Sequence, residues 1–250
     1  MSIVPRNSEN VQLKSNFSVI CLERVIYPCY NIQHERVIIV PKTILFDLDG
    51  TITDSGPGIM NCVELALNHY GIHVENREEL RVFVGPPLRD TFLKFGVPES
   101  DVENAIKIFR SRYVPIGIFE NNPYPGIREL LDQLHAAGHR LYVATSKPET
   151  MAYTVLNHFD LAKYFDLICG ATMDKSRDNK DAVIAYLLEQ APVGQEVIMV
   201  GDTHFDVLGA AAHGIPTIGV TWGYGAAEDM RSAGAVSVVH TMDELLKKLL

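Results

Sequence analysis

The chain has 250 residues, of which 47% are hydrophobic and 21% charged, and its formal net charge is −9. These proportions are typical of a globular protein with enough apolar residues for a core, and the length allows one large domain or two smaller ones. The acidic balance argues against a nucleic-acid polymer as partner, because proteins that bind one normally present a basic face.

The cysteines and the apolar runs bear on the compartment of the protein. The cysteines are scattered, with neither the spacing of a zinc site nor a disulfide framework, so reduced thiols are expected at Cys21, Cys29, Cys62 and Cys169. No apolar run approaches the ~20 residues that span a bilayer, and the N-terminus lacks the pattern of a signal peptide. The sequence therefore predicts a cytoplasmic protein with no membrane partner.

Residues 1–41 are the least informative part of the chain. Two apolar runs, 17–22 and 36–40, could each form a strand, but prolines interrupt this part of the sequence. We expect an N-terminal extension of uncertain structure that contributes no chemistry.

The first informative feature of the chain is a short apolar run that is followed by two carboxylates. Residues 43–46 predict a buried strand, and Asp47, Asp49 and Gly50 follow directly. Residues two apart in extended chain point to the same face, so the two carboxylates should emerge together, where their repulsion favours a bound divalent cation. The alternative at this point is an Asp-Gly turn with both carboxylates in solvent.

Residues 58–120 show helical spacing, and nothing in them predicts a strand. Apolar residues recur three and four positions apart, which predicts helices over 59–70, 77–84, 88–95 and 101–114. This part therefore reads as an all-helical insertion, and the strips rich in Gly and Pro that flank it could act as joints.

From residue 127 onward, helical and strand patterns alternate. Strands are expected at 140–145, 165–169, 196–200 and 215–220, with helices between them and a last strand and helix within 235–250. This alternation predicts a parallel sheet with helices on both faces. Ligands of such sheets bind beyond the carboxyl ends of the strands, where Asp47, Thr145 and Asp202 would share one pocket.

Four motifs occur in a fixed order: an Asp-x-Asp-Gly-Thr sequence, a Thr at a strand end, a Lys, and Gly-Asp-x-x-x-Asp, which here are Asp47 to Thr51, Thr145, Lys180, and Gly201 to Asp206. This ordered set resembles the haloacid dehalogenase (HAD) superfamily of phosphohydrolases, over residues 42–250. The resemblance implies an α/β fold with a Rossmann-like core in 42–57 and 122–250. It makes the helical insertion, 58–121, a C1 cap that acts as a lid over the site.

The resemblance also implies roles for the first two carboxylates. Asp47 would be the nucleophile that forms an aspartyl-phosphate, with a role as metal ligand alone as the alternative. Asp49 would be the general acid and then the general base. In the family, phosphatases and mutases carry Asp at this position, whereas the transport ATPases carry Thr and the dehalogenases lack the acid.

The expected metal is Mg²⁺, because the candidate ligands are all oxygens. Asp202 is the strongest further ligand, and the Asp47 side chain and the Asp49 backbone carbonyl would complete the protein's share. Asp206 would be a ligand or a partner behind the ligands. Its alternative is the N-terminus of the next helix, where Asp is favoured in any case.

Two motifs would bind the phosphoryl group. Thr145 would donate to a phosphoryl oxygen, helped by the Ser146 backbone N–H at a helix start, with a simple helix cap as the alternative. Lys180 would neutralise the phosphoryl group and Asp47. Many relatives carry this lysine in a Lys-Pro pair, which Lys180 lacks, so Lys175 is a rival and a surface lysine remains the alternative.

Further residues would surround the pocket. Arg89, after Gly85-Pro-Pro-Leu in the expected cap, would grip the part of the substrate beyond the phosphate, with a surface arginine as the alternative. Lys147 and His204 would lie at the rim of the pocket, and Trp222 and Tyr224 in a loop beside it.

The combined interpretation is a Mg²⁺-dependent phosphomonoesterase that hydrolyses a small phosphorylated metabolite, as a monomer or homodimer. The motifs resemble most the phosphoglycolate phosphatase and bacterial 5′-nucleotidase branches. One alternative is a β-phosphoglucomutase-like isomerase that uses the same Asp47 and Asp49 but returns the phosphate to the sugar. The other is a non-enzymatic, receiver-type module phosphorylated on an aspartate, against which the helical insertion and the late Gly201-Asp202 both argue.

Overall fold

The computed structural model describes residues 41–174, 176–192, 194 and 196–250. The expected N-terminal extension, apart from Pro41, and the rival lysine Lys175 therefore lie outside the described residues. None of the described helices is long and apolar enough to cross a membrane.

The described elements alternate along most of the chain. The strands are β1 (Thr43–Phe46), β2 (Thr53–Asp54), β3 (Asn122–Pro123), β4 (Arg140–Pro148), β5 (Leu167–Ala171), β6 (Val197–Gly201), β7 (Thr217–Val220) and β8 (Ser237–Val239). The α-helices are α1 (Gly56–His69), α2 (Leu88–Lys94), α3 (Val102–Tyr113), α4 (Ile127–Ala136), α5 (Glu149–His158), α6 (Lys180–Gln190), α7 (His204–Ala211), α8 (Ala227–Ser232) and α9 (Met242–Leu249). Short 3₁₀ helices form η1 (Arg77–Phe83), η2 (Gly117–Phe119) and η3 (Ala162–Tyr164).

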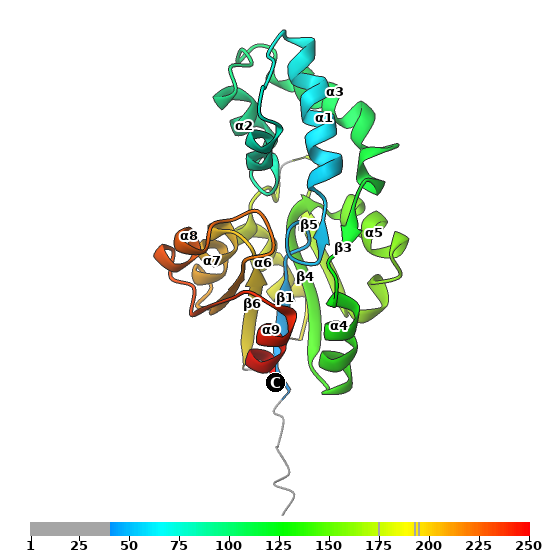
Figure 1. Cartoon of the computed structure of the whole chain (residues 1–250). Coiled ribbons are helices and arrows are strands. Elements are labelled where there is room, and N and C mark those ends of the chain that lie inside the picture. Colours follow the sequence, from blue (N-terminus) through cyan, green and yellow to red (C-terminus); the bar gives the residue numbers. More distant parts are fainter. Residues whose placement is uncertain (1–40, 175, 193, 195) are drawn as a thin grey trace, which may run out of the picture. The chain divides into compact units, whose positions relative to one another are not determined.

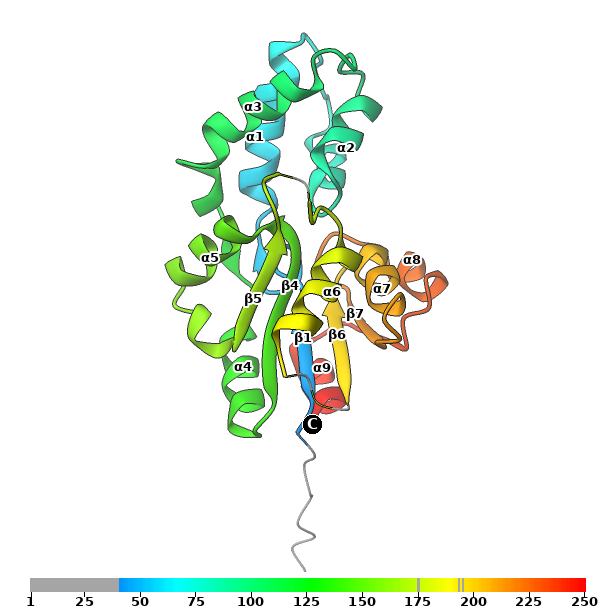
Figure 2. The ribbon, with the colours of Figure 1, turned by 180° about the vertical axis from the view of Figure 1, so that it is seen from behind.

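Six of the described strands form one parallel sheet in the order β5-β4-β1-β6-β7-β8. The strand β1 lies inside the sheet, with Phe46 opposite Val143 of β4 and Val200 of β6. The ends of β1, β4 and β6 therefore meet at one edge of the sheet, and helices flank the sheet on both sides (Figures 1 and 2). The α/β fold expected from the sequence is confirmed.

Side chains of the strands alternate between two apolar clusters, as the period of two in extended chain requires. Ile44 and Phe46 of β1 lie in one cluster, with residues of α4, α5 and α9. Leu45 lies in the other cluster, where its partners include Val183 of α6. Because β1 is buried on both faces, its sequence is continuously apolar and not alternating.

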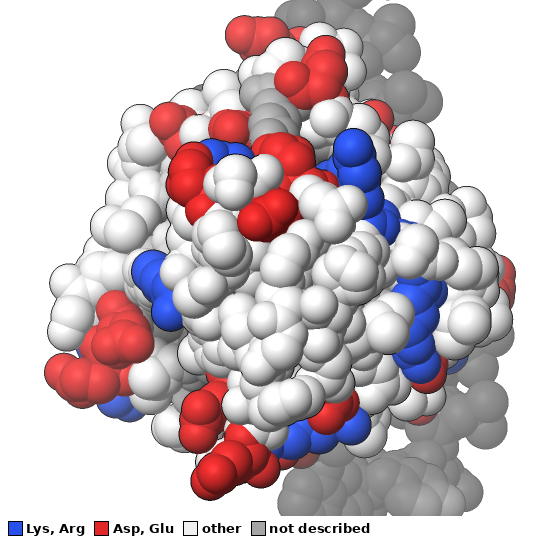
Figure 3. Space-filling model, turned by 90° about the horizontal axis from the view of Figure 1, so that it is seen from above, with Lys and Arg blue, Asp and Glu red and all other residues white. Residues whose placement is uncertain are grey.

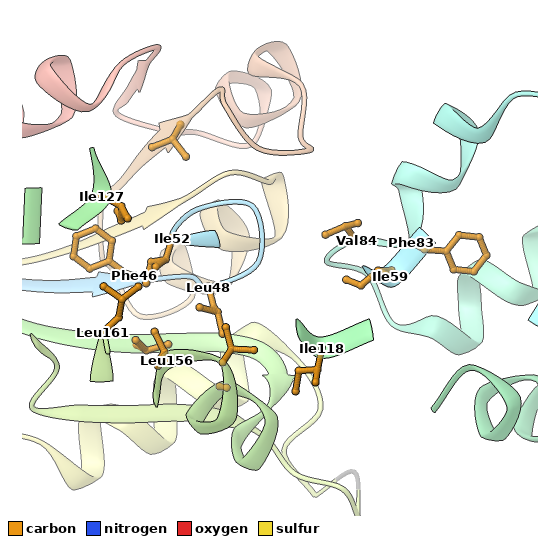
Figure 4. Close-up of a cluster of buried hydrophobic side chains, with 14 of the residues drawn as sticks. Phe46, Leu48, Ile52, Ile59, Phe83, Val84, Ile118, Ile127, Leu156 and Leu161 are labelled. Carbon is orange, nitrogen blue, oxygen red and sulfur yellow. The ribbon is translucent and has the colours of Figure 1, made fainter. Parts of the chain in front are cut away.

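Figure 4 shows how the first of these clusters is built. Phe46 points toward Ile127 and toward Leu156 and Leu161, which lie on and just after α5, and each of these side chains is at most 1% exposed. The same cluster extends to Phe83 in the helical insertion. Burial of this kind stabilises a fold by roughly 1.5–3 kcal/mol for each large side chain.

Between β2 and β3 the chain forms only helices, as expected. The segment 77–84 differs in detail, because it is the 3₁₀ helix η1 and not an α-helix. Its hydrogen bonds span three residues, from Val84 N–H to the Arg81 carbonyl, and Pro86 and Pro87 follow within three residues. Proline has no backbone N–H to donate, so a helix that starts at residue 77 cannot continue through Pro86 and Pro87.

The two linkers of the insertion pair with each other. Thr53 and Asp54 form β2, Asn122 and Pro123 form β3, and the two pair as an antiparallel ribbon. Neither ribbon strand was expected from the sequence, because two residues are too few for a periodic signal. Helix α1 then begins at Gly56, so residues 55–58, the Gly- and Pro-rich strip that precedes the insertion, form the start of a helix.

Seen from above in the view of Figure 3, the surface is largely uncharged, and Lys and Arg side chains lie apart and form no continuous basic patch.

Candidate active site

Three buried carboxylates meet at the carboxyl edge of the sheet. Asp47 follows β1, Asp202 follows β6, and Asp206 lies in the first turn of α7. One carboxylate oxygen from each lies within 4.8 Å of the others. The structure thus brings together the three side chains expected at the metal site, whereas Asp49 was expected to contribute its backbone carbonyl and has another partner for its side chain.

Lys180 is the cation within this acidic cluster. Its Nζ lies 2.8 Å from Asp47 Oδ1 and 2.7 Å from Asp206 Oδ1, and it donates to the Ala144 carbonyl at 2.9 Å. The lysine is 5% exposed, which contradicts the surface-lysine alternative. Asn179 places it, because the Asn179 side chain accepts from the Ala182 N–H and so caps α6 directly before Lys180.

The backbone leaves very little room around Asp202. Gly50 has a φ of +92°, and a Cβ on it would lie 2.2 Å from Asp202 Oδ2. A Cβ on Gly223 would lie 2.3 Å from the same oxygen. These two glycines allow the loops after β1 and β7 to close on Asp202 from both sides.

The charges of the cluster do not balance. Three carboxylates face one ammonium, and burial, Asp206 and Asp47 together raise the pKa of Asp202 well above its usual range. Burial also raises the pKa of Asp206, against the opposing effect of Lys180. For Lys180, burial alone would lower the pKa, but Asp206 and Asp47 outweigh it and raise the pKa.

The cluster fits a divalent cation. Hard cations such as Mg²⁺ prefer carboxylate and carbonyl oxygens, and a cation would offset the excess negative charge of Asp47 and Asp202. Asp206 is the least available ligand, because its Oδ2 accepts from the Thr203 N–H and hydroxyl, both at 3.0 Å, while its Oδ1 faces Lys180. This favours the role behind the ligands that the sequence left open for Asp206.

Asp49 has a separate partner, Lys147. The Lys147 ammonium donates to Asp49 Oδ1 at 3.0 Å and to Oδ2 at 2.9 Å, and to the Tyr113 hydroxyl at 2.5 Å. Lys147 is 7% exposed, so it lies inside the site. The sequence-based expectation had placed it at the rim of the pocket. Tyr113 comes from α3 of the helical insertion, where the sequence pattern predicts a helix over 101–114 and no functional residue.

Thr145 is buried at the expected edge, but Ser146 does not begin a helix. The strand β4 continues to Pro148, with an irregular register between Thr145 and Pro148, and α5 begins at Glu149. The Ser146 N–H is therefore not part of a helix N-terminus, and that part of the phosphate-binding prediction was wrong. Thr145 does not cap α5 either, because its hydroxyl accepts from the Lys147 N–H at 3.3 Å.

The loop after β7 lies beside the site, as expected for Trp222 and Tyr224. The Tyr224 N–H donates to Asp202 Oδ2 at 2.8 Å, and the Trp222 indole N–H donates to the Thr51 carbonyl at 3.1 Å. The Tyr224 hydroxyl donates to Asp54 and accepts from the Gly56 N–H. The loop thus joins a candidate metal ligand to the start of the helical insertion.

Arg89 is not brought to the acidic cluster. Its guanidinium pairs with Glu99 and Glu103 within the helical insertion. Gly85, four residues earlier, does approach the site, since a Cβ on it would lie 3.7 Å from the Thr203 side chain. His204 starts α7 with its ring against Phe205 and makes no contribution to the acidic cluster.

Comparison with known proteins settles the family. The model of the haloacid dehalogenase-like hydrolases matches residues 44–220. The chain belongs to this family. The resemblance inferred from the motifs is therefore confirmed, and with it an enzyme of the phosphatase class, which acts on phosphoric monoesters.

Individual relatives carry several names. The chain is 43% identical to the tyrosine-protein kinase PtkA of Mycobacterium tuberculosis, over 84% of this chain and 72% of that one. It is 39% identical to a 5′-nucleotidase of Pseudomonas aeruginosa, over 76% and 86% of the two chains. A phosphoglycolate phosphatase of Vibrio parahaemolyticus is 29% identical, over 82% and 95%.

A solved structure from Clostridium acetobutylicum, described as a predicted phosphatase, has the same fold. Its TM-score is 0.80 at 42% identity, and the match covers 84% of this chain and 98% of that one. The match thus extends through the core and the helical insertion of this HAD-like hydrolase.

Proposed function

We propose that this HAD-like hydrolase is a Mg²⁺-dependent phosphomonoesterase that acts on a small phosphorylated metabolite through an aspartyl-phosphate on Asp47. The observation that carries the proposal is the buried cluster of Asp47, Asp202 and Asp206, with the Lys180 ammonium against Asp47 and Asp206. Such a site can hold a cation and a phosphoryl group, with Asp47 as the nucleophile.

The chemistry needs two displacements at phosphorus. Asp47 attacks the phosphorus, the bond to the ester oxygen breaks, and Asp49 gives its proton to the leaving oxygen. Asp49 then takes a proton from water, the water oxygen attacks the phosphorus, and the bond to Asp47 breaks to release inorganic phosphate. Both carboxylates end in their starting forms, so the cycle balances.

Other residues would bind and orient the phosphoryl group. Bound at Asp47, Asp202 and the Asp49 carbonyl, with Asp206 as a ligand or behind them, Mg²⁺ would supply Lewis-acid stabilisation of the phosphoryl charge. Lys180 would neutralise Asp47 and a phosphoryl oxygen, and Thr145 would donate a hydrogen bond to another oxygen. Lys147 and Arg89 remain candidates for contacts to the substrate, with Arg89 weakened by its two glutamate partners.

We further propose that residues 58–121 act as a cap over a core formed by 42–57 and 122–250. The contact of Tyr113 with Lys147 supports this, because it joins the insertion to the acid–base side of the site. Lids of this kind exclude water and complete a catalytic site. We also propose a cytoplasmic location, with which the two described cysteines, Cys62 and Cys169, agree because both are free thiols. The protein would act as a monomer or a homodimer.

The substrate class is proposed from the relatives. The 5′-nucleotidase and the phosphoglycolate phosphatase both point to small phosphate monoesters. A mutase would use the same two carboxylates, so release of inorganic phosphate distinguishes the proposed function from it.

A second candidate function is phosphoryl transfer to protein tyrosine. The 43% identity to PtkA over 84% of the chain favours it. The same aspartate cluster could serve both reactions, since both need a cation and an activated phosphoryl group. A kinase would incorporate the γ-phosphoryl group of ATP into a tyrosine peptide, whereas a phosphatase releases phosphate from monoesters without a protein acceptor.

The test is phosphate release from a panel of phosphorylated metabolites, including nucleoside 5′-monophosphates and 2-phosphoglycolate, with Mg²⁺ and with a chelator. We expect release with Mg²⁺ from at least one ester, loss of release in the chelator, and its return when Mg²⁺ is restored. Release unaffected by the chelator would contradict the metal assignment. Tyrosine phosphorylation by ATP without any ester hydrolysis would favour the second candidate function.

A further inference from the structure

The Tyr113 hydroxyl is the point at which the helical insertion touches the acid–base side of the site. It accepts a hydrogen bond from Lys147 Nζ at 2.5 Å, while the same ammonium binds both oxygens of Asp49. The two oxygens of one carboxylate lie close together, so they share the donors on one side of the ammonium, while the Tyr113 hydroxyl accepts from another of its three N–H groups. Lys147 is 7% exposed and Tyr113 3%, so no solvent replaces a lost partner without rearrangement.

Packing holds the Tyr113 ring independently of its hydroxyl. The ring stacks on Phe109, with centroids 5.1 Å apart and planes at 18°. On another side, a Cβ on Gly117 would lie 3.0 Å from the ring. The hydroxyl therefore stands at a fixed place in the site, and Lys147 Nζ also lies 5.0 Å from the ring centroid.

Lys147 by itself is a poor anchor for a carboxylate. Its four-carbon stem is flexible, and an ammonium imposes no direction on its partners, unlike a guanidinium. With the Tyr113 hydroxyl as third partner, the ammonium is fixed between the insertion and the core. Since both Asp49 oxygens are bound to that ammonium, the place of the Asp49 carboxyl follows from the place of the tyrosine.

We propose that Tyr113 is a positioning residue for proton transfer: its hydroxyl anchors Lys147, which in turn holds Asp49 in line with the leaving oxygen of the substrate. This inference rests on the proposed phosphomonoesterase function. It assigns to the cap a residue that acts on the acid–base step, without contact to the phosphoryl group and without a role in the acidic cluster of Asp47.

The Tyr113→Phe variant tests the proposal, because it keeps the ring and removes the anchor. The probes are phenyl phosphate and 4-nitrophenyl phosphate, which have nearly the same shape but leaving groups of very different basicity. Phenolate needs the proton from Asp49 as it leaves, whereas nitrophenolate leaves without one. The readout is kcat/KM, which reports the steps through departure of the leaving group.

We expect kcat/KM for phenyl phosphate to fall about tenfold or more in Tyr113→Phe, a part of the 10²–10⁴ that general acid catalysis supplies. For 4-nitrophenyl phosphate we expect a loss of less than about threefold. The matched control is Tyr70→Phe, which removes another tyrosine hydroxyl of the insertion, bonded to the Asp101 carbonyl and the Asn104 amide away from the site. It should leave the ratio of the two rates unchanged.

A double-mutant cycle tests whether Tyr113 acts through Lys147. In a Lys147→Met background, Tyr113→Phe should cause no further loss on phenyl phosphate, because the link it would break is already absent. Equal losses on both esters in Tyr113→Phe, or losses that simply multiply in the double variant, would overturn the inference while leaving the proposed function intact. A wild-type enzyme inactive on both probes and on the metabolite panel would overturn the proposed function and, with it, this inference.

Discussion

Lys180 and Lys147 are two buried lysines of one site that are held in different ways. The partners of Lys180 are Asp47, Asp206 and the Ala144 carbonyl, all of them on the sheet or on α7. Lys147 has Asp49 on one side and Tyr113 from the helical insertion on the other. The part of the site around Lys180 and Asp47, which we propose binds the phosphoryl group (the phosphoryl side), is thus built from strand ends and the first turns of α6 and α7. The part around Asp49 and Lys147, which we propose transfers protons (the acid–base side), depends on the insertion.

The largest expected effect is on the phosphoryl side. Asp47→Asn should lower kcat by on the order of a thousandfold or more, because the amide is nearly the same size but cannot act as an equivalent nucleophile. Phosphate release from the best metabolite measures it, with circular dichroism as the control for folding. If the variant keeps a substantial fraction of wild-type turnover, the covalent mechanism is wrong.

Replacing each lysine by methionine should lower the free energy of unfolding by different amounts on the two sides of the site. Lys180→Met leaves buried carboxylates without their cation and should lower the free energy of unfolding by about 3–5 kcal/mol in the absence of metal. Lys147→Met leaves only Asp49, which is 9% exposed, and should cost less, about 1–3 kcal/mol. Urea titrations in a chelator measure both. A larger loss in Lys147→Met would reverse the comparison.

Metal binding should stabilise the phosphoryl side in a pH-dependent way. Burial, Asp206 and Asp47 raise the pKa of Asp202, so the folded state holds this proton more tightly than the unfolded state. Stability without metal therefore falls as pH rises above the unfolded value of about 3.9, and Mg²⁺ should offset more of this loss at pH 8 than at pH 5.

Thermal unfolding with and without Mg²⁺ at the two pH values measures this effect. At one fixed Mg²⁺ concentration, chosen as 100 times the Kd at pH 8, the stabilisation should reach about 2.7 kcal/mol at pH 8 and should be smaller at pH 5. Asp202→Asn is the control and should lose most of the shift. A shift that is equal at both pH values, or that survives in Asp202→Asn, would remove Asp202 from the metal site.

The smallest expected effect lies on the side of the insertion. Arg112, next to Tyr113 on α3, donates to both oxygens of Glu120, at 2.7 and 2.8 Å, and with Asn61 lowers the pKa of Glu120 to about 2. Because this pKa is lowered, ionised Glu120 adds to the free energy of unfolding at pH values above its unfolded pKa of about 4.3. That stabilisation is lost as the pH falls toward 2.

Glu120→Gln should therefore cost about 0.5–1 kcal/mol at pH 7, since the pair is partly exposed, and almost nothing near pH 2. Urea titrations at the two pH values measure the difference from wild type. A cost that does not change with pH would mean that packing, and not charge, is lost in the variant.

The sequence predicts the phosphoryl side well for a physical reason. Asp47, Thr145 and Asp202 each follow an apolar run, and parallel strands bring such ends to one edge, so their convergence needs no knowledge of packing. Lys180 could be placed there only through the family motif, because a lysine in sequence resembles a surface residue. Its burial follows from contacts of α6 with β4 that no local pattern encodes.

The acid–base side could not be predicted in the same way. Tyr113 belongs to an apolar stripe of α3, and its spacing is the same whether its hydroxyl faces solvent or the site. Lys147 lies within the last residues of β4, where the register is irregular between Thr145 and Pro148. Because the strand continues to Pro148, the expected helix start at Ser146 does not form. Pairing across the insertion depends on tertiary packing, which sequence periodicity does not report.

The most direct test of the central claim is a single turnover stopped in acid. The enzyme is mixed with 4-nitrophenyl [³²P]phosphate and Mg²⁺, quenched within milliseconds, and digested for peptide mapping. The account predicts transient label on the peptide that contains Asp47, labile to hydroxylamine as an acyl phosphate is, and no label in Asp47→Asn. Turnover without labelled enzyme, or stable label on a tyrosine, would contradict it.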